Sequence, residues 1–172
     1  MVIIHSIIIS MSTTKIFIYG VPGVGKTYYS HQLSKDLNLP IIEGDKVKKS
    51  TGVVLGTCQA YKKFGALNQT NVIKGLLYVR DLYRTALIDK IANKNEFILE
   101  CAFLDPLSFI KVGRVILMTS QDEKLHRTYY LKHRDKLLDL SGDEFAAARI
   151  IQEYLIKEAI KLNIEITDNG AN

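Results

Sequence analysis

The sequence contains no tryptophan and only two cysteines among its 172 residues. Cys58 and Cys101 lie far apart and have no metal-ligand spacing, so the sequence indicates neither a disulfide framework nor a cysteine metal site. We expect both to be free thiols in a reducing compartment. Long apolar runs are also absent, and none is long enough to predict a helix that spans a bilayer.

Internal repeats, low-complexity tracts and linkers rich in proline or glycine are absent as well. We therefore expect one domain over residues 11–172. The apolar start VIIHSIIIS is short and has no basic leader, which makes it a poor signal peptide and leaves the cytoplasm as the default location. Because MSTTKIFIYG looks like a natural beginning, we expect residues 1–10 to be a dispensable extension. An extra edge strand over residues 2–9 is the alternative.

What the chain does contain is an ordinary globular balance, with 47% hydrophobic and 24% charged residues. The formal net charge is +5, which favours an anionic partner. The same charge permits nucleic acid binding, but it is weak evidence for it.

Apolar runs alternate with helical periodicity along the chain. The patterns predict strands over residues 15–19, 40–45, 97–103, 114–120 and 164–167, and helices over residues 26–37, 69–92, 122–138 and 143–161. This order predicts an α/β fold of three α/β/α layers around a five-stranded parallel sheet. Parallel sheets bind ligands at the carboxyl ends of their strands, so we expect Gly20, Asp45, Glu100 and Ser120 to gather on one rim.

The segment GVPGVGKT, residues 20–27, matches the phosphate-loop pattern G-x-x-x-x-G-K-[ST] between a predicted strand and a predicted helix. Glycines let the backbone wrap an anion, and the amides at the helix start then point at phosphates. Lys26 is expected to bridge the β- and γ-phosphates, and the Thr27 hydroxyl to hold Mg²⁺. The predicted nucleotide-binding residues are Gly20, Pro22, Gly23, Val24, Gly25, Lys26, Thr27 and Tyr28.

Two acids follow buried strands at the predicted rim. Glu100 closes the run FIL, where an acid would orient the Mg²⁺ shell or an acceptor hydroxyl. Asp45 follows the second strand and could accept a proton from an acceptor hydroxyl in line with the γ-phosphate. A solvated strand-end acid for Glu100 and a helix N-cap for Asp45 are the alternatives. Glu43 would point to the opposite face of its strand.

Basic residues follow the second strand and fill the helix that begins near residue 122. Lysines in DKVKKS and YKKF suit an acceptor that carries a carboxylate or phosphate, and Gly52, Gly56 and Gly65 predict a flexible acceptor-binding segment there. Arg127 and Arg134 lie on one helix face and could neutralise charge on the γ-phosphoryl group, although surface ion pairs would also explain them. Arg149, within an apolar stretch, needs an anionic partner.

These residues resemble the kinase core of the 2-phosphoglycerate kinase-like group, within the nucleoside-monophosphate-kinase-like phosphate-loop enzymes. The likeness rests, in chain order, on GVPGVGKT; Asp45-Lys-Val-Lys48; ILECAFLDP; and LHRTYYLKHR followed by ARIIQEYLIKEA. The family usually has arginine where this chain has Lys48, and the lid-like stretch LLDLSGDEF is acidic and lacks arginine.

The resemblance implies ATP and Mg²⁺ as cofactors and a small phosphorylated hydroxy acid as acceptor. It implies acceptor-binding or charge-handling roles for Asp45, Arg127, Arg134 and Arg149. Lys48 is a further candidate for binding the acceptor. We therefore favour an ATP-dependent small-molecule kinase in which Lys26, Asp45, Arg127 and Arg134 are catalytic. A polynucleotide or nucleotide kinase is the first alternative, and a non-catalytic nucleotide-dependent switch protein is the second.

Overall fold

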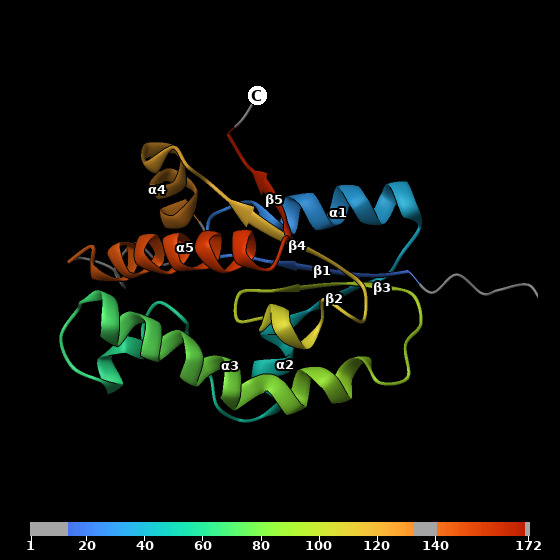
Figure 1. Ribbon diagram of the computed structural model, residues 1–172, viewed down its shortest axis with the longest axis horizontal. Coiled ribbons are helices and arrows are strands. Elements are labelled where there is room, and N and C mark those ends of the chain that lie inside the picture. Colours follow the sequence, from blue (N-terminus) through green and yellow to red (C-terminus); the bar gives the residue numbers. More distant parts are fainter. Residues whose placement is uncertain (1–13, 133–140, 171–172) are drawn as a thin grey trace, which may run out of the picture.

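The structure is a computed structural model that describes residues 14–132 and 141–170 (Figure 1). The expected extension over residues 1–10, and Arg134, lie outside these residues. Five strands form one sheet in the order β2-β3-β1-β4-β5, and every neighbouring pair is parallel. The predicted five-stranded parallel α/β fold is therefore confirmed. Its strands are β1 (Lys15–Tyr19), β2 (Ile41–Glu43), β3 (Phe97–Cys101), β4 (Arg114–Thr119) and β5 (Glu165–Asp168).

Helices cover both faces of the sheet, which gives the three predicted layers. The helices are α1 (Lys26–Leu37), α2 (Gly44–Ser50), α3 (Gln69–Ile91), α4 (Glu123–Lys132) and α5 (Asp143–Lys161), with short 3-10 helices η1 (Ala60–Lys63) and η2 (Pro106–Ser108). After β1 and α1 the chain continues to β2 and β3 on one side of β1, and then to β4 and β5 on its other side. Helix α1 covers one face of the sheet, while α3 and α5 pack together on the other (Figure 1).

The centre of the sheet is apolar on both sides, because β1 and β3 lie between neighbouring strands and under helices. Four of the five β1 residues are buried, as are four of the five in β3. The Phe17 ring stacks on Phe109 at 4.7 Å and meets Phe97 edge-on at 5.6 Å. Such near-continuous apolar strands are typical of parallel sheets.

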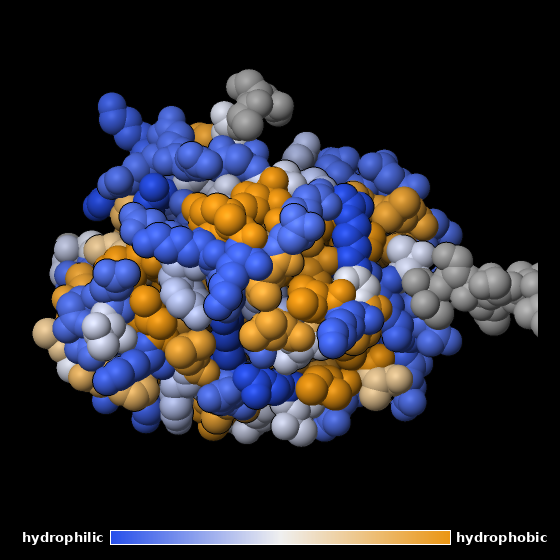
Figure 2. Space-filling view, in the orientation of Figure 1, coloured by the Kyte–Doolittle hydropathy of each residue, from blue (hydrophilic) through white to orange (hydrophobic). Residues whose placement is uncertain are grey.

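Helix α3 begins at a polar cap, where the Asn68 side chain accepts a hydrogen bond from the Asn71 amide at 2.9 Å. One side of the helix is buried and the other is exposed. Several apolar residues on the exposed side, among them Leu77 and Leu82, remain in contact with solvent. Along the lower edge of Figure 2, where α3 runs, polar residues interrupt the apolar surface.

Residues 44–50 differ from the prediction. Strand β2 ends at Glu43, and Gly44 begins α2, so Asp45 lies in the first turn of a helix and does not end a strand. The expected flexible segment from residue 46 onward therefore starts as a regular helix. Gly44 makes this possible because a Cβ there would lie 2.9 Å from the Cys101 Cβ, so only glycine lets the helix start so close to β3. Two lysines in the last turn complement the helix dipole.

No helix within residues 14–132 and 141–170 is long and apolar enough to cross a membrane.

Candidate functional site

The phosphate loop connects the carboxyl end of β1 to the start of α1. Gly25 occupies the N-cap of α1 with φ +86°, a conformation that a side chain would strain. The amides of Gly23, Val24 and Gly25 donate no hydrogen bond to any other residue of the described chain. Together with the free amides of the first turn of α1, they form a set of unused donors at a helix N-terminus. This is the arrangement that binds phosphate.

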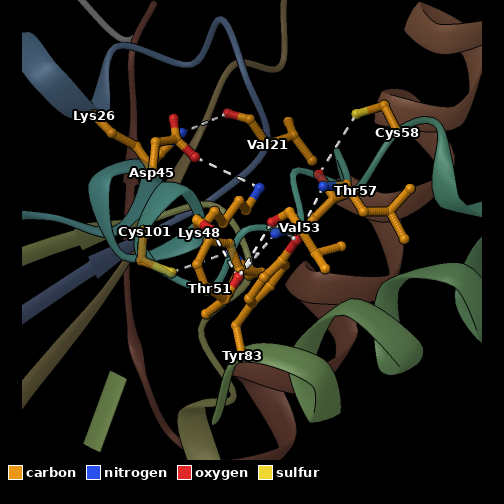
Figure 3. Close-up of polar contacts among 12 residues, drawn as sticks. Val21, Lys26, Asp45, Lys48, Thr51, Val53, Thr57, Cys58, Tyr83 and Cys101 are labelled. Atoms are coloured by element: carbon orange, nitrogen blue, oxygen red, sulfur yellow. Dashed lines mark hydrogen bonds and ion pairs between the residues drawn. The ribbon is translucent and has the colours of Figure 1, made fainter. Parts of the chain in front are cut away.

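Lys26 reaches back over this loop from the start of α1. Its side chain is almost fully buried, and its Nζ donates to the Val21 carbonyl at 2.9 Å (Figure 3). Burial lowers the pKa of Lys26, while the nearby carboxylates of Glu100 and Asp45 act to raise it. A buried ammonium bonded to a neutral carbonyl is costly, so an anion beside it would be favourable.

Glu100 lies next to the first turn of α1 and is half-buried at the end of β3. The Ser30 hydroxyl lies 3.2 Å from the Glu100 carboxylate and 3.0 Å from the Thr27 carbonyl, and it links the two elements. The Thr27 side chain is exposed. A hydroxyl and a carboxylate are hard oxygen ligands, and Mg²⁺ prefers such ligands together with phosphate and water. The donor set therefore fits the expected Mg²⁺ site.

Asp45 lies beside Lys26, and Asp45 and Lys48 face one another across one turn of α2 (Figure 3). Their charged groups are 3.5 Å apart, yet the Asp45 side chain is 77% exposed and that of Lys48 only 7%. The Lys48 ammonium lies 4.4 Å from the centre of the Phe103 ring and 5.7 Å from that of Tyr83. An exposed carboxylate and a shielded ammonium therefore lie next to each other beside Lys26.

The Tyr83 hydroxyl fixes the segment that follows α2. It donates to the Val53 carbonyl at 2.8 Å and accepts from the Leu55 amide at 2.9 Å (Figure 3). Val53 and Val54 remain exposed at the tip of this segment. The predicted acceptor-binding region is therefore irregular between α2 and η1, and Tyr83 anchors it to α3.

The arginines expected at the phosphates have other contacts in this structure. The Arg127 guanidinium lies over the Phe145 ring, 5.4 Å from its centre. Arg149 donates to the Ser120 carbonyl at 2.7 Å and to the Gln121 carbonyl at 3.4 Å. Among the described residues Arg149 thus has carbonyl partners after β4 and no carboxylate partner, and its expected anionic partner stays a prediction. Arg134 lies outside the described residues.

Of the other predicted nucleotide-binding residues, Val24 is buried and Tyr28 is 71% exposed. Two residues at the loop were not predicted to act there. Asn169, after β5, lies so close to Gly25 that a Cβ on Gly25 would come within 2.6 Å of its amide nitrogen. His126 contacts the Pro22 carbonyl. The Asn-Gly turn signal after the last strand could have drawn attention to Asn169. No sequence signal distinguished His126 from a surface histidine.

No protein-family model matches the chain, and no curated protein matches it in sequence. Solved structures do match it. The chain is similar to shikimate kinase from Acinetobacter baumannii in complex with shikimate, with 19% identity and a TM-score of 0.59 over 93% of this chain and 87% of that one. It is similar to shikimate kinase from Bacteroides thetaiotaomicron, with 18% identity and a TM-score of 0.56 over 89% and 84% of the two chains.

A third similar structure is deoxyadenosine kinase from M. mycoides with bound dATP. Its identity is 16% and its TM-score 0.58, and the alignment covers 92% of this chain and 93% of that one. At these identities the likeness establishes a shared fold, the P-loop kinase fold, and leaves substrate and residue roles to be argued from the site.

Proposed function

We propose that the protein is an ATP-dependent phosphotransferase that moves the γ-phosphoryl group of ATP to a small anionic acceptor. The observation that carries the proposal is the set of unused amides over residues 23–25 beside the buried ammonium of Lys26. Fold likeness to kinases supports it. Phosphoryl transfer asks little of a protein beyond positioning and charge stabilisation, and this site has residues for both.

Each rim residue has a role in this reaction. The loop amides and Lys26 hold the phosphates, and Thr27 and Glu100 would hold Mg²⁺, which when bound neutralises charge on the β- and γ-phosphates. Asp45 orients the acceptor hydroxyl and accepts its proton as the γ-phosphoryl group is transferred. Arg127 and Arg134 are proposed to stabilise the transferred group from α4 and from the segment that follows it.

Lys48 argues for an anionic acceptor. Its ammonium has one charged partner among the described residues, the exposed Asp45 carboxylate, and is otherwise flanked by aromatic rings. A carboxylate or phosphate on the acceptor would compensate this shielded charge. A small phosphorylated hydroxy acid resembling 2-phosphoglycerate has both the hydroxyl for Asp45 and the anion for Lys48. Such a reaction uses cytoplasmic ATP, and we propose the cytoplasm as its location.

A nucleoside or nucleotide acceptor is the second candidate, because one structure with the same fold is a deoxyadenosine kinase. The net charge of +5 also keeps an oligonucleotide end among the acceptors to be tested.

The test is ATP turnover by the full chain with Mg²⁺ against 2-phosphoglycerate, other phosphorylated hydroxy acids, shikimate, nucleosides, nucleoside monophosphates and oligonucleotides. ADP release measures turnover, and phosphorus NMR identifies the new phosphoester. We expect a small anionic acceptor to raise turnover above the background hydrolysis rate. If none of the acceptors does so while ATP binds tightly, the nucleotide-dependent switch is the better description.

Lys26→Ala is the matched loss-of-function variant. We expect it to lower acceptor-stimulated turnover by roughly 100-fold or more, because it removes a charge aimed at the transferred phosphate. Lys35→Ala is the control, since Lys35 is exposed in the last turn of the same helix and should turn over like the unmodified chain. Equal turnover by the two variants would contradict the assignment of Lys26.

A further inference from the structure

His126 of α4 connects three parts of the molecule that meet behind the phosphate loop. The side chain is fully buried. Its Nε2 lies 2.9 Å from the Pro22 carbonyl oxygen, and its Nδ1 lies 3.3 Å from a guanidinium nitrogen of Arg149. None of the roles proposed above for ATP or acceptor uses this ring.

The two partners fix the tautomer of the ring. A guanidinium can only donate hydrogen bonds, so Nδ1 of His126 must accept from Arg149. The proton of the neutral imidazole is then on Nε2, which donates to the Pro22 carbonyl. A doubly protonated ring would point an N–H at the guanidinium and lose the Arg149 contact. One protonation state therefore satisfies both contacts.

Arg149 is itself held in place, so the ring has a fixed support. Its guanidinium donates to the carbonyls of Ser120 and Gln121 after β4. The Gln152 side chain accepts from the Ser120 amide at 3.0 Å and donates to the Ser120 carbonyl at 3.1 Å. A continuous set of hydrogen bonds thus runs from α5 and the end of β4, through His126, to Pro22.

A second contact places α4 directly on the loop. Gly23 has φ +85°, and a Cβ there would lie 2.8 Å from the backbone nitrogen and Cα of Tyr130. The main chain of α4 therefore lies against the loop one residue after the Pro22 contact. Helix α4, which stands beside α5 in Figure 1, also carries Arg127 next to His126. A shift of α4 would therefore both move Arg127 and disturb the phosphate loop.

We propose that His126 is a positioning residue, whose neutral ring locks α4 and Arg127 to the outer side of the phosphate loop and keeps the loop in its nucleotide-binding shape. The inference rests on the proposed nucleotide binding by residues 20–27. It adds a residue that touches neither nucleotide nor acceptor and acts through the Pro22 carbonyl.

The charges around His126 favour the neutral ring. Burial lowers its pKa, Arg149 of α5 and Lys26 at the start of α1 lower it further, and the Pro22 hydrogen bond and Glu123 of α4 act to raise it. The ordinary pKa is 6.5, so the neutral ring contributes fully above that pH. The contribution is lost as the pH falls through the lowered pKa of the folded protein. Acid should therefore weaken nucleotide binding through this ring.

Two variants separate the hydrogen bonds from the packing. His126→Phe keeps a ring against Phe145, whose centre lies 5.0 Å away, and removes both hydrogen bonds. His126→Gln keeps a donor and an acceptor but cannot titrate. A fluorescent ATP analogue would report affinity between pH 5 and pH 8, and circular dichroism would give the Tm of each variant. Because the variants are compared at the same pH, protonation of the nucleotide affects all of their affinities equally.

We expect His126→Phe to weaken binding of the analogue about three- to tenfold at pH 7.5, the fold-change for one or two net hydrogen bonds. His126→Gln should bind within roughly twofold of the unmodified chain at that pH, and tighter than it once the pH falls below the lowered pKa of His126. Unchanged affinity of the phenylalanine variant would overturn the inference alone. So would parallel pH profiles of the glutamine variant and the unmodified chain across the pH at which the His126 ring gains its second proton. An unmodified chain that does not bind the analogue would overturn the proposed function as well.

Nitrogen-15 NMR of the imidazole in the unmodified protein gives a test that needs no substitution. The expected signal at pH 7.5 is a neutral ring with its proton on Nε2. A charged ring, or a proton on Nδ1, would contradict the contacts from which the inference is built, even if His126→Phe failed to fold.

Discussion

Among single residues, Asp45 lies near the phosphate loop as expected, but its local structure differs from the prediction. Asp45 was placed at a strand end, but it lies in the first turn of α2, where an acid is favoured by the helix dipole. The acid nevertheless remains among the charged groups that act on Lys26. Its closeness to the phosphate loop thus follows from the parallel topology, while its helical setting depends on Gly44 packing against β3.

Asp45→Asn should lower acceptor-stimulated turnover by about 100- to 10,000-fold, because it removes the proposed proton acceptor while keeping the shape of the side chain. ATP affinity, measured with the fluorescent analogue, should change little since Asp45 makes no contact with the loop amides. Steady-state kinetics with the best acceptor of the panel would measure the effect.

Glu43→Gln is the matched control for this prediction. Glu43 is exposed, two residues earlier, and its carboxylate pairs with Lys46 at 2.8 Å. We expect its turnover to equal that of the unmodified chain. Full turnover by the Asp45 variant would show that another group accepts the proton and that Asp45 does not act as a base.

At the scale of helices and strands, α3 and α5 are joined by a buried ion pair. Arg80 donates from its two terminal nitrogens to the two Glu158 oxygens at 2.9 and 2.7 Å, and their side chains are only 3% and 14% exposed. Such a pair is a modest contributor as a whole, because desolvation offsets its attraction. Removing one partner is different, since it leaves a buried charge without compensation.

Arg80→Met should therefore lower the free energy of unfolding by about 3–5 kcal/mol, measured by urea denaturation at pH 7.5. The double variant Arg80→Met with Glu158→Leu should recover much of this loss. Arg114→Met is the control: Arg114 pairs with Glu165 at 2.8 Å, but both side chains are about half exposed, so its loss should be below about 1 kcal/mol. Equal losses for the two single arginine variants would show that burial does not decide the cost.

Most helices and strands could be predicted because each depends on its own pattern. The helix over residues 69–92 was predicted from apolar residues such as Val72, Leu76 and Val79, and α3 ends one residue earlier. Residues 44–50 could not be predicted in this way. Seven residues are too few for apolar periodicity to indicate a helix, and glycine at the first position does not favour one. Helix α2 begins where Gly44 packs against Cys101, and its two last-turn lysines lie at the end that the helix dipole favours.

At the scale of the whole molecule, parallel topology brings the site together. The carboxyl ends of five parallel strands lie on one rim, so an acid or a loop after any strand was expected there. The phosphate-loop pattern can be recognised from the sequence because it is local to eight consecutive positions, and its binding of nucleotide stays a prediction. The contacts of Arg149 and His126 were not predicted, because they join residues more than 20 or 100 positions apart and depend on how α4 and α5 pack.

The rate at which the two buried cysteines react with a thiol reagent can report whether nucleotide stabilises the folded chain. Cys58 is fully buried and Cys101 is 2% exposed, and neither forms a disulfide. Burial raises the pKa of Cys101 to about 12, although the Phe103 amide and Lys48 act to lower it. Hardly any Cys101 thiolate exists at pH 8, the thiolate is the reactive form, and burial keeps reagent away from both thiols. Both cysteines should therefore react with a disulfide reagent only after the fold opens.

ATP should then protect the thiols, because a ligand that binds only the folded chain lowers the population of the open form. At a concentration of 100 times its Kd the ligand adds about 2.7 kcal/mol, which slows labelling about 100-fold when reclosing is faster than reaction. Labelling rates with and without ATP, at a urea concentration below the transition, measure this. Lys26→Ala should lose the protection while keeping slow labelling without ATP. Rapid labelling of the folded chain would contradict the burial of the thiols, and equal protection of both chains would contradict the role of Lys26 in nucleotide binding.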